Sequence, residues 1–185
     1  MTAVVDKIVR VTEAQATFWS RAHGWAPTAA AGLLSKSRLD RQCSLARTLK
    51  DYAKRPLSNE EDARLILAYV TLRTLSEGTL KLFFSVWYSD YSADVDAIMK
   101  RGKRLDPDGA AFDPLIKLFE MKTSGRWTRL LRRIQARGNA IHAFKDRPLG
   151  SFSELRATIK GYGDFLIDTD NRLPYPDADF APFRA

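Results

Sequence analysis

Signals for the start of a helix occur at three places in this chain and constrain its fold more than any other feature. Each is a capping-box pattern, with Ser or Thr three residues before Glu or Gln: Thr12 with Gln15, Ser58 with Glu61, and Ser151 with Glu154. After Ser58, apolar residues recur every three or four positions as far as about Tyr91. The apolar–polar alternation typical of strands is weak throughout. The sequence therefore predicts an all-α fold, an antiparallel helical bundle with short connections.

Turn residues and breaks in the apolar spacing divide the chain into the expected helices. These run over 12–22, from 28 or 37 to 54, from 58 to about 88–91, from Pro114 (capped by Asp113) to about 122, over 126–144, and over 151–168. We expect residues 101–114 to form a loop and the aromatic cluster within 83–88 to pack in the core. Residues 1–170 are predicted to form one domain, and the proline-rich segment 171–185 an extended tail.

The chain has 185 residues and one cysteine, Cys43, which excludes an intramolecular disulfide and a cysteine-based zinc site. We expect Cys43 to be an inert packing residue. The sequence has no phosphate-cradling glycine loop and no cluster of metal ligands, so we expect neither a metal nor a cofactor. The apolar runs fall far short of the ~20 residues that a membrane span requires, and the N-terminus lacks a signal-peptide pattern. These features predict a cytoplasmic protein with no membrane partner.

Basic residues outnumber acidic ones, giving a net charge of +8. Such a balance favours a polyanion such as nucleic acid as partner, although charge alone leaves open a basic protein without one. In the predicted helix 126–144 the basic residues fall at spacings of three and four. One row holds Arg126, Arg129, Arg133 and Arg137, and an adjacent polar row holds Arg132, Gln135, Asn139 and His142.

The same helix has an apolar stripe formed by Trp127, Leu130, Leu131, Ile134 and Ile141, which we expect to be buried. Gly138 lies on this stripe. Because glycine costs a helix about 1 kcal/mol relative to alanine, its position indicates a close backbone approach or a local bend.

From Gln135 to Arg147 the sequence reads QARGNAIHAFKDR, with four residues between Arg137 and His142. This segment resembles the signature of HEPN domains, in which an arginine precedes a histidine by four to six intervening residues within a helical bundle. The resemblance implies a metal-independent endoribonuclease of a toxin–antitoxin or antiviral defence system, with an antitoxin or defence complex as a further partner. It also implies a homodimer in which two motifs face each other. The family favours a polar residue directly after the arginine, whereas here Gly138 comes first and Asn139 second.

These residue types suit cleavage of RNA by its own 2′-hydroxyl. We hypothesise that His142 is the general acid or base, that Arg137 stabilises the phosphorane-like transition state, and that Asn139 orients the reacting groups. The RNA backbone would be guided by Arg129, Arg133 and Lys145. On an ideal helix Arg137 and His142 point about 140° apart. Their convergence therefore needs a distortion near Gly138, the reach of arginine, or the second subunit that the resemblance implies.

Two other classes of function stay open. The segment from Pro114 through the KTSG turn into the arginine-rich helix fits a helix-turn-helix that places its second helix in a DNA groove. A non-catalytic HEPN-like interaction module also fits. His23, beside Gly24, is interpreted as a residue at a helix C-terminus.

Overall fold

The protein is described from a computed structural model, which covers residues 1–54, 58–142 and 146–176. The all-α prediction is confirmed, and the described residues form eight α-helices. These are α1 (Thr2–Trp19), α2 (Thr28–Lys36), α3 (Leu39–Tyr52), α4 (Glu61–Val86), α5 (Tyr88–Ala93), α6 (Phe112–Lys122), α7 (Thr128–Gly138) and α8 (Phe152–Asp170). Short 3-10 helices cover η1 (Ser58–Glu60), η2 (Pro107–Gly109) and η3 (Asn139–Ile141), and β1 (Met99–Lys100) pairs with β2 (Lys103–Arg104).

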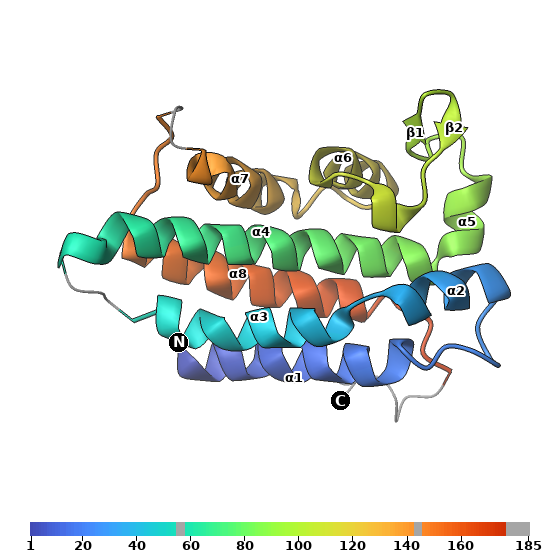
Figure 1. The fold of residues 1–185 in the computed structure, drawn as a ribbon, viewed down its shortest axis with the longest axis horizontal. Coiled ribbons are helices and arrows are strands. Elements are labelled where there is room, and N and C mark those ends of the chain that lie inside the picture. Colours follow the sequence, from blue (N-terminus) through green and yellow to red (C-terminus); the bar gives the residue numbers. More distant parts are fainter. Residues whose placement is uncertain (55–57, 143–145, 177–185) are drawn as a thin grey trace.

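Helix α4 is the central element of the bundle. Figure 1 shows it running through the middle of the molecule, with α1 and α3 on one side and with α6, α7 and the β1–β2 hairpin on the other. Helix α8 packs against α4, α1 and α7. Buried side chains from seven helices meet in the main core, among them Ile8, Leu49, Leu72, Tyr91, Phe119, Leu131 and Phe165.

The first helix begins at Thr2, so the predicted start at Thr12 was wrong. Thr12 lies inside α1, where its hydroxyl donates to the carbonyl oxygen of Ile8 at 2.7 Å. The amide of Gln15 is also buried and donates to Asp170 in α8 at 2.9 Å. A pattern that resembles a cap is here a pair of interior residues, because Val5 and Ile8 extend the buried face toward the N-terminus.

Other boundaries also differ from the prediction. Ser37 is extended, so 28–54 forms two helices and not one. Helix α4 begins at Glu61 after a 3-10 turn, and the side chain of Ser58, its predicted cap, lies outside the described residues. Helix α6 begins at Phe112, which places the predicted cap Asp113 inside its first turn.

The capping box at the start of α8 is confirmed. The hydroxyl of Ser151 accepts from the backbone N–H of Glu154 at 3.2 Å, and the Glu154 carboxylate accepts from the backbone N–H of Ser151 at 2.9 Å. Two backbone donors of the first turn are thereby satisfied, which fixes the point where the chain enters the helix.

The first residues of the predicted tail pack against the bundle. Leu173 and Tyr175 are buried in a second apolar cluster with Trp19, whose indole N–H donates to the Tyr175 hydroxyl at 3.1 Å. The Tyr175 hydroxyl in turn donates to Asp170 at 2.7 Å. The part of the tail from 177 to 185 lies outside the described residues.

Among the helices described, none is both long and apolar enough to cross a membrane. Nor does this part of the chain gather three or more His, Cys, Asp or Glu side chains in an arrangement that could hold a metal ion.

Candidate functional site

Helix α7 packs closely on α4 at Gly138. A Cβ atom at this position would lie 2.9 Å from the Cβ of Arg73 and 3.0 Å from the carbonyl oxygen of Tyr69, both in α4. The predicted close backbone approach at Gly138 is thus confirmed. Leu131 and Ile134 on the same stripe are fully buried, whereas Ile141, which we expected to be buried, is 51% exposed.

Helix α7 ends at Gly138, so the predicted continuation to about residue 144 was wrong. The chain tightens into a 3-10 turn over Asn139–Ile141, and the backbone N–H of His142 donates to the carbonyl oxygen of Asn139 at 3.3 Å. His142 itself has an extended backbone. Arg137 and His142 therefore do not share one regular helix, and the ideal 140° separation does not describe them. Lys145, a predicted RNA contact, lies outside the described residues.

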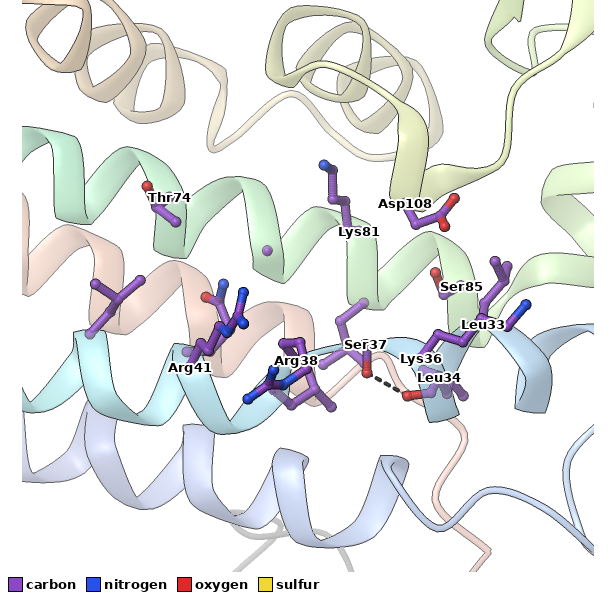
Figure 2. A pocket seen from close by; sticks show the side chains of 15 residues that line it. Leu33, Leu34, Lys36, Ser37, Arg38, Arg41, Thr74, Lys81, Ser85 and Asp108 are labelled. Carbon is purple, nitrogen blue, oxygen red and sulfur yellow. Dashed lines mark hydrogen bonds between the residues drawn. The ribbon is translucent and has the colours of Figure 1, made fainter.

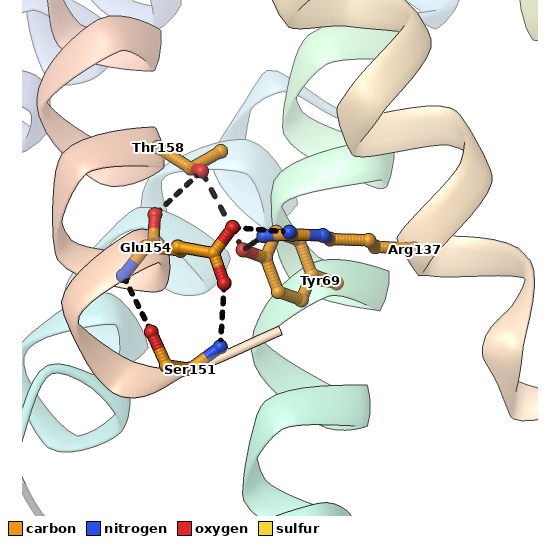
Figure 3. A network of polar contacts seen from close by, with 5 residues as sticks. All are labelled: Tyr69, Arg137, Ser151, Glu154 and Thr158. Carbon is orange, nitrogen blue, oxygen red and sulfur yellow. Dashed lines mark hydrogen bonds and ion pairs between the residues drawn. The ribbon is translucent and has the colours of Figure 1, made fainter. Parts of the chain in front are cut away.

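The Arg137 side chain points into the bundle. Figure 3 shows it extending from α7 toward Tyr69 of α4 and Glu154 of α8. Its Nη1 donates to the Tyr69 hydroxyl at 2.5 Å, and its Nη2 donates to the Glu154 carboxylate at 2.7 Å. The guanidinium carbon lies 5.2 Å from the centre of the Tyr69 ring. Only 14% of the side chain is exposed. Through these contacts Arg137 links α7 to α4 and α8.

Gly150 covers the Arg137 guanidinium from the loop before α8. A Cβ atom at Gly150 would lie 2.6 Å from the guanidinium carbon, and its φ of +79° is one that other residues rarely adopt. Burial acts to lower the pKa of Arg137, but the hydrogen bonds to Glu154 and Tyr69 outweigh burial and raise the pKa. The hydrogen bond from Arg137, together with that from the Ser151 backbone, lowers the pKa of Glu154. The ion pair is thus charged at neutral pH.

The other predicted catalytic residues lie beyond this network. His142 is exposed at the end of the 3-10 turn, and Asn139 is half-buried at its start. Within the described residues, no hydrogen bond joins Arg137 to either of them. The hydrogen bonds of Arg137 within the described chain therefore run to Tyr69 and Glu154 and not to the other predicted catalytic groups.

The outward face of α7 presents the rest of the basic row. Arg129 and Arg133 are exposed and form no hydrogen bond or ion pair within the described parts of the chain. Arg126 lies over the Trp127 ring, 4.7 Å from its centre, and approaches Asp168 at 4.0 Å. Arg132 belongs to the other row and pairs with Asp113 of α6. A well-packed helix thus carries two guanidinium groups that pair with no carboxylate in the described part of the chain.

A second basic feature, the β1–β2 hairpin, was not predicted. Met99 pairs with Arg104 and Lys100 with Lys103, and the turn residues Arg101 and Gly102 both have positive φ, of 52° and 76°. Positive φ at both turn positions suits a tight hairpin, and glycine adopts it without strain. The signal in the sequence was the Gly102 between pairs of basic residues, in a segment too short to show strand alternation.

All four cations of the hairpin are exposed: Lys100, Arg101, Lys103 and Arg104. None of their side chains forms a hydrogen bond or ion pair with another described residue. The hairpin lies on the same side of α4 as α7, with α6 between them (Figure 1). This side of the molecule therefore carries unpaired positive charge on two separate elements.

Comparison of the chain with protein-family models, curated proteins and solved structures finds no match.

Proposed function

We propose that this protein binds RNA through the basic side formed by α7 and the β1–β2 hairpin. The supporting observation is that Arg129 and Arg133 are exposed, have no ion-pair partner among the described residues and are carried by one packed helix. Four residues correspond to about 6 Å along a helix, so the two groups can reach different phosphates of one strand. An arginine without a carboxylate partner offers its full fork of donors to phosphate oxygens.

The rigidity of α7 supports the same proposal. The close approach at Gly138 and the Arg137 bonds to Tyr69 and Glu154 fix this helix on α4 and α8. A binding surface held in place before the ligand arrives loses less conformational entropy on association. In this proposal Arg137 positions the binding helix and does not contact RNA in the single chain.

The choice of RNA over DNA rests on the resemblance of the segment 135–147 to HEPN domains. The helix-turn-helix alternative would instead place the outward face of α7 against duplex DNA. Its outward arginines, Arg129 and Arg133, would then contact a groove. Affinity for single-stranded RNA and for duplex DNA of equal length distinguishes the two.

Metal-independent cleavage of the bound RNA is a second candidate function. The observation that favours it is the exposure of His142 just after the 3-10 turn that follows this helix. In a homodimer of the kind that the resemblance implies, two copies of His142 could supply the base for the 2′-hydroxyl and the acid for the 5′-oxygen. The expected products are a 2′,3′-cyclic phosphate and a 5′-hydroxyl. Because Arg137 is engaged by Glu154, it would stabilise the phosphate only if dimerisation released it.

Fluorescence anisotropy with a labelled 20-nucleotide RNA tests the binding proposal. Arg129→Ala/Arg133→Ala should weaken binding about tenfold or more. The matched control is Arg10→Ala/Arg21→Ala, which removes two exposed cations in or just after α1, on the other side of α4, that also have no ion pair with the residues described. Equal loss of affinity in both double variants would contradict a binding face on α7. Tighter binding of duplex DNA than of RNA would favour the helix-turn-helix alternative.

Incubation of the same RNA in EDTA tests cleavage separately. The native protein should produce ends with cyclic phosphate, whereas His142→Ala should bind RNA as tightly and leave it intact. RNA that remains intact with the native protein would refute the ribonuclease proposal and leave RNA binding as the proposed function.

A further inference from the structure

A cavity of about 330 Å³ opens between α2, α3 and α4. None of its lining residues belongs to α7 or to the hairpin, so it is separate from the proposed RNA-binding side (Figure 2). Most of its surface is apolar, formed by leucine side chains: Leu33, Leu34, Leu39, Leu45 and Leu82. The volume lies at the lower end of the range for small-molecule sites. At about 30 Å³ for each water-sized group, it accommodates roughly ten non-hydrogen atoms.

The wall contributed by α4 carries a polar group without a partner. Ser85 is only 6% exposed, yet its hydroxyl forms no hydrogen bond with any described residue. Because Ser85 lines the cavity, its hydroxyl is available to a group in that space. The Gln42 side chain lies across Gly78, close enough that a Cβ there would meet its Nε2 at 2.4 Å. The Gln42 amide has no hydrogen bond to the described residues either.

The charges around the cavity are unevenly distributed. Four cations line it, of which Arg38 pairs with Asp40 and Lys81 with Glu77. The other two, Lys36 and Arg41, are exposed and have no ion pair within the described chain. Both come from the α2–α3 wall, whereas the one lining carboxylate, Asp108, comes from η2 across the cavity (Figure 2). The α2–α3 wall is therefore the positive side of an apolar cavity, with Arg41 at one end of this wall and Lys36 at the other (Figure 2).

We propose that this cavity binds a small amphipathic carboxylate, an alkyl chain of about eight carbons with one anionic head. The chain would occupy the leucine-lined space, and Arg41 would hold the head. Gln42, the next residue in α3, adds an uncharged hydrogen-bonding group that a purely apolar ligand would leave unused. The proposal is independent of RNA binding, because the two sites share no residue.

Isothermal titration calorimetry with octanoate tests the site, with octan-1-ol, octylammonium and octyl phosphate as comparison ligands. Octanoate should bind at least about tenfold more tightly than the alcohol or the ammonium. In a ¹⁵N-labelled sample, octanoate should shift backbone amide signals of α2, α3 and α4 around the cavity. Equal binding of octanoate and octan-1-ol, or shifts located elsewhere, would overturn the proposal. Tighter binding of octyl phosphate than of octanoate would overturn the choice of a carboxylate.

Two variants locate the head group. Arg41→Glu should weaken octanoate binding about tenfold or more. The control Arg129→Glu makes the same charge change on α7 and should leave octanoate binding unaltered while weakening RNA binding. An Arg41→Glu variant that is folded by circular dichroism and binds octanoate like the native protein would refute the site.

Discussion

Replacing Arg137 with alanine separates a structural role of this residue from a purely catalytic one. In the folded chain its guanidinium bonds to Tyr69 and Glu154 and is covered by Gly150. A residue that acts only on substrate can be removed with little effect on stability. Arg137→Ala should instead destabilise the native state, because α7 loses its polar tie to α4 and α8.

The size of the effect follows from the exposure of each partner. Tyr69 is fully buried, and a hydrogen bond between a charged donor and such a group contributes about 1.5–3 kcal/mol. The contact of the guanidinium with the Tyr69 ring adds about 0.5–1 kcal/mol. Glu154 is half-exposed, so solvent screens its ion pair and the pair adds little. The expected loss is roughly 2–4 kcal/mol, which for a chain of this size lowers Tm by about 5–15 °C.

Thermal and urea unfolding followed by circular dichroism measure this loss. Arg137→Lys should recover only part of it, since an ammonium cannot reproduce the two-pronged geometry. Arg133→Ala, on the exposed face of the same helix, is the matched control and should stay within about 0.5 kcal/mol of the native protein. If Arg137→Ala were as stable as this control, the three-helix tie would be refuted.

Three further predictions follow from other contacts. Gly138→Ala should cost about 1–3 kcal/mol in urea unfolding, because its methyl group would overlap α4, and a variant of native stability would contradict the close approach. Hydrogen bonds from Arg137 and Lys122 hold the pKa values of Glu154 and Asp94 below their ordinary 4.5 and 3.8. The folded state then binds fewer protons than the unfolded chain, so stability is full near neutral pH and declines as pH falls below about 4.5 and through the lowered values. Glu154→Gln should flatten that decline, and an unchanged acid unfolding curve would count against the ion pair. Burial raises the pKa of the Cys43 thiol, so iodoacetamide should modify it far more slowly in the native protein than in urea, and equal rates would contradict its burial.

Local signals predicted those parts of the fold that depend on neighbouring residues. The Ser151–Glu154 capping box is a contact within one turn, so its four-residue pattern was sufficient to locate the start of α8. Gly138 is informative for a related reason. A glycine lowers the stability of any helix that contains it. Its place on the apolar stripe therefore indicated a compensating interaction, which is the close contact with α4.

Long-range partners decided what the sequence did not predict. The same capping pattern at Thr12 and Gln15 lies inside α1, because Gln15 meets Asp170 of the last helix. Arg137 stands in a regular basic row, yet Tyr69 and Glu154, both distant in sequence, turn it inward. The spacing of a row shows which residues share a face but not which of them finds a partner across the bundle.

The salt dependence of RNA binding tests the central proposal most directly. Each arginine–phosphate contact with a single strand contributes about 0.7 to the slope of log K against log salt concentration. Arg129→Ala/Arg133→Ala should therefore make the slope shallower by about 1.4, while Arg10→Ala/Arg21→Ala keeps the native slope. A slope that is the same for the native protein and the α7 double variant would show that Arg129 and Arg133 do not contact the RNA backbone.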